Sequence, residues 1–467
     1  MQKQFNGNQL TRIGIDFGTT HTSAALYDGK QIHPIPLDLM NDNPNLLRSM
    51  IYVNREQKVH LGLDAVKTFL AQDTGREVVF EEKVVGTITN TVASHDAQEN
   101  VTIIYDTFIE EDVGIRGRLL QSIKTGLRGD SYKGTKIFGQ YYTLQELIAL
   151  ILRHVRQQAS AHLGQEVTAA TLGRPVQFVE DPAADQRAER RLREAAEQAG
   201  FTDINFVPEP VAAASFYLAQ VTAPETVLIF DFGGGTLDLT LLRTDGAGNH
   251  EILATHGVLV GGDDLDSEIM RHIVAPHFGS ESPIDINFDD QPIPFPEDLA
   301  ENLYLWQSIP NLSRPQALKV LERALRYSPE QEKFVALEAL VTRNHGFALF
   351  EQIEQAKRRL TAAEETMLRM QVEAIDLAVL LRRKRFNRAI GDEISDARLG
   401  VRTILAEAGL EAAGVDAVVT TGGSSVIPIF QKMLTDEFPT ATLVPLDTFS
   451  GVTSGLAIRA YETNAKR

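Results

Sequence analysis

The same short pattern occurs twice in this chain, and the repeat limits what the chain can fold into. In the first copy, an apolar run leads into residues 16–20 (DFGTT), and a second apolar run ends at residues 28–29 (DG). In the second copy, residues 231–236 (DFGGGT) join two apolar runs, the second of which ends at residues 245–246 (DG). Two apolar runs joined by a tight turn of small residues are typical of a β-hairpin. The repeat therefore predicts a duplicated fold in which each half begins with a glycine-containing hairpin.

The residues at the two turns favour phosphate binding. Glycine lets the backbone approach an oxyanion closely, and the amides and hydroxyls of such a turn can donate hydrogen bonds to phosphate oxygens. Two tips of this kind can hold one polyphosphate from opposite sides, whereas a pair of tight hairpins without a ligand is the simpler alternative. The candidate phosphate-binding residues are Gly18, Thr19, Thr20, His21, Gly233, Gly234, Gly235 and Thr236.

An aspartate stands just before each turn, Asp16 in the first copy and Asp231 in the second. Mg²⁺ prefers oxygen ligands and retains several waters, so carboxylates often hold it through water. We expect Asp16 and Asp231 to hold hydrated Mg²⁺ or to orient an attacking water. The alternative is that each aspartate only caps its own turn, but its occurrence in both copies favours the metal.

The composition narrows the class of partner. The chain has 467 residues, a net charge of −18 and no cysteine. An acidic chain is a poor candidate for nonspecific binding to nucleic acids or anionic membranes. No apolar run reaches the roughly eighteen residues of a membrane span, and the N-terminal residues lack the apolar core of a signal peptide. We therefore expect a cytoplasmic protein with no nucleic-acid and no membrane partner.

The remaining patterns predict strands and helices in a repeated order. From residue 12 the sequence predicts three strands, a helix, a strand and a helix, and the same order again in the second half. One helix is predicted to begin at a capping box of Thr143 and Glu146, and a long amphipathic helix is predicted from about residue 350 to 381. Residues 280–298 are proline-rich and are expected to be irregular. Strands that alternate with helices indicate an α/β fold.

We expect this fold to be divided into two lobes. The expected bounds are lobe I at residues 12–220 with an insertion at about 47–140, lobe II at residues 221–461 with a largely helical insertion at about 263–410, and flexible tails at residues 1–11 and 462–467.

Six segments resemble, in order, the motifs of the nucleotide-binding domain of the seventy-kilodalton heat-shock (Hsp70, DnaK-type) chaperones, a family of the actin-like ATPase superfamily. Together they span nearly the whole chain. They are residues 14–20 (first phosphate loop), 123–129 (segment of the catalytic lysine), 209–214 (connecting motif), 230–238 (second phosphate loop), 354–361 (nucleoside-contacting helix) and 422–428 (adenosine motif).

The resemblance implies a two-lobed actin-like ATPase fold, related to ribonuclease H, with duplicated β-β-β-α-β-α cores and inserted subdomains. It also implies ATP or ADP and Mg²⁺ as cofactors. In this reading Lys124 lies near the γ-phosphate and supports the attack of water, and Thr236 belongs to the same catalytic set. Glu209 acts with Asp16 and Asp231 on the metal or on the water. Without the resemblance, Lys124 would be interpreted as a surface lysine and Glu209 as a helix N-terminal acid.

The resemblance further implies a nucleoside site at a helix and a glycine turn. Lys357 and Thr361 are four residues apart and share one face of the predicted helix, although a basic run is also typical of a solvated face. Val426 stands where many family members place an arginine over the adenine ring, so the cation–π contact is lost. The candidate nucleoside-binding residues are Glu354, Lys357, Arg358, Thr361, Gly422, Gly423, Ser424 and Val426.

The function implied by the resemblance is that of an ATP-binding, chaperone-like switch. We expect a weak Mg²⁺-dependent ATPase whose lobe closure follows the bound nucleotide and whose protein partners are clients or co-chaperones. The chain stops after Tyr461 without the family's linker and β-sandwich, so we expect a stand-alone relative that lacks the peptide-binding domain. Three alternatives stay open: a small-molecule (sugar-type) kinase of the same superfamily, an actin-like filament protein, and a pseudo-enzyme that does not hydrolyse its nucleotide.

Overall fold

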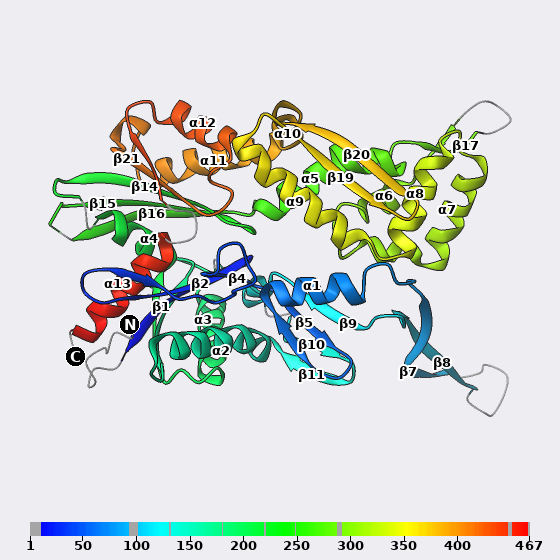
Figure 1. Cartoon of the computed structure of the whole chain (residues 1–467), viewed down its shortest axis with the longest axis horizontal. Coiled ribbons are helices and arrows are strands. Elements are labelled where there is room, and N and C mark those ends of the chain that lie inside the picture. Colours follow the sequence, from blue (N-terminus) through cyan, green and yellow to red (C-terminus); the bar gives the residue numbers. More distant parts are fainter. Residues whose placement is uncertain are drawn as a thin grey trace.

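Two mixed β-sheets form the cores of the two halves of the protein, one in the lower left and one in the upper left of Figure 1. The computed structural model describes residues 11–92, 101–129, 132–179, 181–218, 221–247, 249–286, 292–446 and 451–465. Within these ranges, no helix is both long enough and apolar enough to cross a lipid bilayer. The first and last elements of the described residues, β1 (Arg12–Phe17) and α13 (Gly451–Ala465), lie side by side at the left of the view.

The first sheet has six strands in the order β13-β12-β1-β2-β3, with β4 also paired to β2. Its strands are β1 (Arg12–Phe17), β2 (His21–Tyr27), β3 (Ile32–Pro34), β4 (Leu46–Arg48), β12 (Ala169–Arg174) and β13 (Asp203–Pro208). The second sheet has five strands in the order β16-β15-β14-β21-β22. Its strands are β14 (Glu225–Phe232), β15 (Leu237–Thr244), β16 (His250–Val258), β21 (Ala417–Thr421) and β22 (Thr442–Pro445).

The two sheets have the same connectivity, which confirms the predicted duplication. In the first sheet β1 pairs with β2 in antiparallel and with β12 in parallel orientation. In the second sheet β14 pairs in antiparallel with β15 and in parallel with β21. The register places Asp16 opposite Ser23 and Asp231 opposite Asp238. The two aspartates therefore occupy equivalent positions at the end of the first strand of each sheet.

Helices cover both sheets and also lie between them. They are α2 (Leu144–Leu163), α3 (Pro182–Gln198), α4 (Glu209–Leu218), α5 (Gly262–Ile269), α11 (Gly391–Glu407), α12 (Pro428–Glu437) and α13 (Gly451–Ala465). One buried apolar cluster joins α2 and α3 to the first sheet, and another joins α5, α11 and α12 to the second. A third cluster contains Ala213 of α4, Ile229 of β14 and Leu456 of α13.

The last helix, α13, packs against β1 and β2 of the first sheet and against α4 (Figure 1). The approach to β1 is close, because a Cβ built at Gly14 would lie only 2.3 Å from the backbone nitrogen of Ala457. A helix from the end of the chain thus completes the half of the molecule that begins the chain. The tail expected from residue 462 is instead part of α13 as far as residue 465, and the first ten residues lie outside the described ranges.

Two insertions occupy the right side of Figure 1. The first insertion contains β5 (Ile51–Asn54), β6 (Val59–Leu61), α1 (Gly62–Gln72), β7 (Phe80–Val92), β8 (Val101–Asp112), β9 (Gly117–Leu120), a 3-10 turn (Ile123–Leu127), β10 (Gly134–Ile137) and β11 (Gln140–Thr143). The second insertion contains β17 (Pro283–Ile286), β18 (Pro292–Pro294), α6 (Glu297–Glu301), a 3-10 turn (Ile309–Ser313), α7 (Pro315–Tyr327), α8 (Gln331–Thr342), α9 (Gly346–Ala362), β19 (Glu365–Val372), β20 (Ile375–Arg382) and α10 (Arg383–Ala389).

The long helix predicted from residue 350 to 381 is wrong in its second half. Helix α9 ends at Ala362, and the hairpin of β19 and β20 follows. Along β20 every second residue is buried, from Ile375 to Leu381, which is the period of a strand packed on one face. Glu373 has a φ of 48° at the hairpin turn. The proline-rich stretch 280–298 is also less irregular than expected, because β17 and β18 pair within it.

The capping box at the start of α2 is confirmed. The Glu146 backbone N–H donates to Thr143 Oγ1 at 3.1 Å, and the Thr143 backbone N–H donates to Glu146 Oε2 at 2.7 Å. Thr143→Ala removes the hydroxyl acceptor and is expected to lower the free energy of unfolding by about 1 kcal/mol. Thr143→Ser, which keeps the hydroxyl, is the control. Equal losses in the two variants, measured by chemical denaturation, would show that the cap contributes nothing.

Candidate functional site

The turns of the two equivalent hairpins meet tip to tip. The Gly18 N–H donates to the carbonyl of His21 at 3.0 Å, and the Gly233 N–H donates to the carbonyl of Thr236 at 2.9 Å, so both turns close in the same way. A Cβ built at Gly234 would lie 1.7 Å from Oγ1 of Thr20 in the facing turn. Glycine is therefore required for the two turns to approach this closely.

A cavity of about 120 Å³, here called the inner cavity, lies at these turns. It takes its lining from both sheets and from the connecting segments. The lining residues include Asp16, Gly18, Thr19, Thr20, His21, Lys124, Arg128, Phe178, Glu209, Asp231, Gly233, Gly234, Gly235, Thr236, Asp238, Gly422 and Gly423. The structure thus brings together the predicted phosphate- and metal-binding residues, which are far apart in the sequence, and adds Arg128, Phe178 and Asp238 to them.

An ion pair connects two of the candidate catalytic residues in the inner cavity. Lys124, in the 3-10 turn of residues 123–127, places its Nζ 2.7 Å from Oε1 of Glu209, the first residue of α4. Only 12% of each side chain is exposed. A Cβ at Gly173, at the end of β12, would lie 2.9 Å from Cγ of Glu209, so the glycine leaves room for the glutamate. Lys124 is therefore not the exposed lysine that its sequence context alone suggested.

The carboxyl groups of the inner cavity have strongly perturbed acidity. Burial, followed by the negative charge of Glu209, raises the pKa of Asp16 to about 7. Burial and the neighbouring Asp238, Glu209 and Asp16 raise the pKa of Asp231 well above its usual value. Burial and Glu209 also raise the pKa of Asp238. These shifts have the sign expected for acids that are withdrawn from water and repel one another.

The positive charges in the cavity do not balance these acids. Burial opposes the charged form of Lys124, but the carboxylates of Glu209 and Asp16 outweigh it and raise the pKa of the lysine. Lys124 and Arg128 stand against four carboxyl groups in the lining. A polyphosphate anion fits such a cavity only together with a divalent cation, and carboxylate oxygens suit Mg²⁺.

The side chains of the described residues do not form a site that could coordinate a metal ion without other ligands. Among the residues that the structure describes, no three His, Cys, Asp or Glu side chains are arranged to hold a metal ion by themselves. Asp16, Asp231 and Glu209 could reach Mg²⁺ through its waters, with phosphate oxygens as further ligands. Their metal-binding role stays a prediction. Thr20 Oγ1 offers an additional donor, since it is buried and has no hydrogen-bond partner among the described residues.

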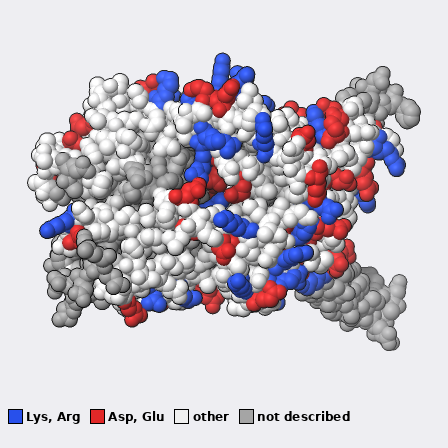
Figure 2. Space-filling model, viewed as in Figure 1, with Lys and Arg blue, Asp and Glu red and all other residues white. Residues whose placement is uncertain are grey.

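A second cavity of about 420 Å³, here called the outer cavity, adjoins the first, since both are lined by Thr20, His21, Gly233, Gly234 and Gly423. It extends between the two insertions. Its further lining includes Arg48, Met50, Asp263, Asp266, Trp306, Phe347, Phe350, Glu351, Glu354, Lys357, Arg358, Thr361, Ser424 and Ile427. On the face drawn in Figure 2, acidic and basic side chains gather beside one another in the middle, where the two halves meet.

The polar groups of the outer cavity come mainly from α9 and the start of α5. Lys357 Nζ donates to the Gly262 carbonyl at 2.6 Å and to Asp266 Oδ2 at 2.7 Å. Burial, opposed by the charge of Lys357, raises the pKa of Asp266 to about 7. The Thr361 hydroxyl donates to the carbonyl of Arg358, 2.7 Å away. Lys357 and Thr361 do line the same cavity, but their polar atoms are engaged by the protein itself.

The glycine turn after β21 is shaped by close contacts. Gly422 has a φ of +84°, and a Cβ there would lie 2.4 Å from the carbonyl oxygen of Phe232. The Ser424 hydroxyl donates to the carbonyl of Gly233 at 3.0 Å, which ties this turn to the second glycine turn. Val426 lines neither cavity, and 39% of its surface is exposed. It is the one candidate binding residue that the structure does not bring to the site.

Sequence reasoning did not select Asp238, Asp263, Asp266 or Arg48 as site residues. Asp238 could have been found, because it is a charged residue within an apolar strand, directly opposite Asp231. Asp263 and Asp266 follow a Gly-Gly turn, but nothing near them in the sequence indicates that α5 faces α9. No local signal identifies Arg48, which lies at the end of β4.

The comparison with known families agrees with this geometry. Residues 12–302 and 341–463 match the family model described as Hsp70 protein. The match covers most of the chain and includes both glycine turns, Lys124, Glu209 and the whole of α9.

Proposed function

The chain belongs to the Hsp70 family, and from this premise we propose that it binds ATP and ADP with Mg²⁺ between its two lobes and hydrolyses ATP slowly. Its fold is the two-lobed actin-like ATPase fold of that family, and membership supports an ATP-binding, chaperone-type function in general. We further propose that the protein acts as a nucleotide-dependent switch. The bound nucleotide sets how far the lobes close, and this closure controls the interaction with a client or co-chaperone protein.

One observation supports this proposal most strongly. Two equivalent glycine turns from two equivalent sheets meet at a cavity that also contains Lys124, Glu209 and the paired aspartates. Backbone amides of the turns would bind the phosphate oxygens. The carboxylates of Asp16 and Asp231 would hold hydrated Mg²⁺, which supplies charge neutralisation for phosphoryl transfer.

The remaining roles follow from the positions of the side chains. Lys124 would stabilise the negative charge that develops on the transferred phosphoryl group. Glu209 holds Lys124 by the 2.7 Å ion pair and would orient the attacking water or a metal-bound water. Thr236, whose hydroxyl donates to Asp238 Oδ2 at 3.0 Å, would add a donor at the phosphates. In the outer cavity, Glu354 and Gly423 would contact the nucleoside, with Gly422 beside them in the inner cavity.

Calorimetry with ATP and ADP, with and without Mg²⁺, tests the binding, and release of inorganic phosphate tests the hydrolysis. We expect Mg²⁺-dependent binding of both nucleotides. Release of free phosphate, with no label transferred to added sugars, would separate hydrolysis from small-molecule kinase activity. Absence of nucleotide binding under these conditions would refute the proposal.

Lys124→Ala is expected to leave nucleotide binding largely intact and to slow turnover at least about tenfold, because the positive charge acts mainly on the developing phosphoryl charge. Lys432→Ala is the matched control, since Lys432 forms an exposed ion pair with Asp436 on α12 and should turn over at the wild-type rate. If Lys124→Ala abolishes binding but leaves the rate per bound nucleotide unchanged, the role of Lys124 is wrong.

A further inference from the structure

One hydroxyl group each from α5, α9 and the turn after β21 lines the outer cavity. All three donate to backbone carbonyls of the protein, Thr361 at 2.7 Å, Ser424 at 3.0 Å and Ser267 at 3.1 Å. A hydroxyl that already donates its proton can only accept a hydrogen bond from a ligand. Adenine and guanine both carry N–H groups that such a hydroxyl can accept, so these residues do not distinguish the two bases.

Most charged side chains of the outer cavity are engaged with the protein as well. Lys357 Nζ donates to a backbone carbonyl and to a carboxylate. Arg48 donates from Nη1 and Nη2 to the two carboxylate oxygens of Glu351, each at 2.8 Å. The carboxylates of Glu354 and Asp263 can only accept hydrogen bonds when ionised. They can take N–H groups from either purine or hydroxyl groups from the ribose.

The amide side chains in the lining are oriented by contacts within the protein. Asn41 Nδ2 donates to a backbone carbonyl at 3.0 Å, Asn43 Oδ1 accepts a backbone N–H at 3.1 Å, and Gln121 Oε1 accepts an indole N–H at 3.1 Å. An amide identifies adenine when both its oxygen and its nitrogen face the base edge. Of the amides in the described lining, only Gln307 makes no hydrogen bond with a described residue, and it is exposed.

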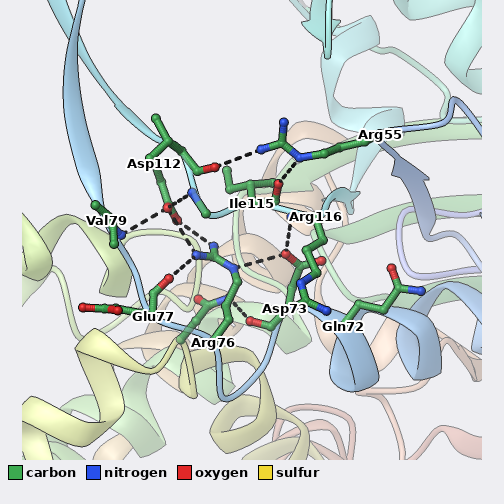
Figure 3. A network of polar contacts seen from close by, with 12 residues as sticks. Arg55, Gln72, Asp73, Arg76, Glu77, Val79, Asp112, Ile115 and Arg116 are labelled. Carbon is green, nitrogen blue, oxygen red and sulfur yellow. Dashed lines mark hydrogen bonds and ion pairs between the residues drawn. The ribbon is translucent and has the colours of Figure 1, made fainter.

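The wall that carries Gln121 is braced within the first insertion. In Figure 3, Arg76 lies between Asp73 and Asp112 and forms an ion pair with each of them. Asp73 also accepts the backbone N–H of Arg116, one residue before β9, at 2.8 Å. Gln121 follows β9 directly. These contacts hold the main chain that leads to Gln121, so this wall of the cavity is fixed before a ligand enters.

Contacts suited to the flat faces of a base are present in the same cavity. Ile427 and Phe350 belong to the lining, and Trp306 packs against Phe347 at a centroid distance of 4.9 Å. Arg358 is exposed, lines the cavity and forms no hydrogen bond or ion pair with a described residue. A guanidinium group stacks well on an aromatic face. Every base has such a face, so stacking depends little on which base is bound.

We propose that the outer cavity binds a purine base through its faces rather than through its edge, so that the protein binds guanine nucleotides about as tightly as adenine nucleotides. This inference rests on the proposed function and widens its ligand class from ATP and ADP to purine nucleoside di- and triphosphates. Strong discrimination arises where a site is built to hydrogen-bond one particular group of its ligand, because the analogue leaves that site unpaired. The side chains of the described lining do not form such a site.

The test is calorimetric titration of the full chain with ADP and with GDP, each with Mg²⁺. We expect the two dissociation constants to agree within about tenfold, because stacking and the phosphate contacts are common to both nucleotides. A ratio beyond about tenfold in either direction would overturn the proposal, since it would show that the base edge is read. If ADP binds and GDP does not, only this inference falls. If neither nucleotide binds, the proposed function falls as well.

Arg358→Ala tests the contact with the base face. It is expected to weaken binding of ADP and of GDP by the same factor, roughly two- to fivefold, because the stacked arginine acts on either base. Arg359→Ala on the same helix is the matched control. Arg359 donates to Thr366 Oγ1 and to the carbonyl of Met367 and lines neither cavity, so both affinities should be unchanged. A loss for only one nucleotide, or for neither, in Arg358→Ala would contradict the proposal.

Thr361→Val tests the base edge, because it removes a hydroxyl of the lining and keeps the shape of the side chain. The ratio of the ADP and GDP affinities should equal that of the wild type, whatever the variant does to each affinity alone. A changed ratio would show that Thr361 distinguishes the two bases and would overturn the proposal.

Discussion

Gly455→Ala is expected to destabilise the protein by about 3 kcal/mol, the upper part of the range for overpacking of a close contact. Gly455 lies in α13 where that helix crosses α4. A Cβ built there would lie 1.7 Å from the carbonyl oxygen of Ala212 and 2.4 Å from its carbonyl carbon. Both atoms belong to the backbone, so no side-chain rotation can relieve the clash, and the two helices must separate.

The effect is measured as the shift in chemical denaturation between wild type and variant. Gly391→Ala in α11 is the matched control, because no atom lies within 4 Å of a Cβ built there. That substitution is expected to be neutral or slightly stabilising, as alanine favours a helix over glycine. If both variants unfold at the wild-type denaturant concentration, the close crossing of α13 and α4 is not required for stability.

The close crossing of α13 and α4 also shows which kind of contact could not be predicted from the sequence. The hairpins around Asp16 and Asp231 could be predicted because all the residues that define them lie within one short segment. The packing of α13 on the first sheet could not, because it joins residues near 455 to β1 and β2 and leaves no periodic signal. The glycine at position 455 is explained only when Ala212 is placed beside it.

The incorrect prediction of a helix beyond residue 362 has a different physical origin. In β20 the buried residues Ile375, Leu377, Val379 and Leu381 alternate with exposed ones. The same positions include residues four apart, so they also satisfy the spacing of an amphipathic helix that continues α9. The turn at Glu373, with its φ of 48°, carries no glycine or asparagine that would have separated the two interpretations.

The candidate site was largely predictable because its residues lie in short motifs that resemble those of a known family. The exceptions act through tertiary contacts. Arg48 and Glu351 are 303 positions apart, and Asp266 meets Lys357 across 91 positions. Such partners become visible only when α5, α9 and β4 are assembled around the outer cavity. Their chemistry is ordinary, so residue type alone did not distinguish them from surface charges.

Asp231→Asn is expected to have opposite effects on stability and on function. Asp231 is buried beside Asp238, Glu209 and Asp16, and burial together with their repulsion raises its pKa. A neutral amide of the same shape removes this repulsion, so the variant should unfold at a higher temperature than the wild type when no nucleotide is present. The same change removes a carboxylate expected to hold hydrated Mg²⁺, and it should weaken binding of ATP with Mg²⁺ roughly 10- to 100-fold.

The raised pKa values also predict the direction in which stability changes with pH. An acid whose pKa is raised by folding contributes stability that is fully present below its unfolded pKa and is lost as the pH rises through its folded pKa. For Asp16 that window runs from 3.8 to about 7, and Asp231 and Asp238 shift in the same direction. The wild type should therefore lose stability as the pH rises from 3.8 to about 7, and Asp231→Asn should lose less.

The measurement is thermal unfolding at several pH values in a chelating buffer, with calorimetric binding of ATP and Mg²⁺ in parallel. Asp376→Asn on the exposed face of β20 is the control for an Asp-to-Asn change outside the cavity and should alter neither quantity. A lower unfolding temperature for Asp231→Asn at pH 8, or wild-type affinity for ATP with Mg²⁺, would contradict the prediction. The carboxylates would then be ordinary turn caps, and the inner cavity would not owe its acidity to a requirement for Mg²⁺.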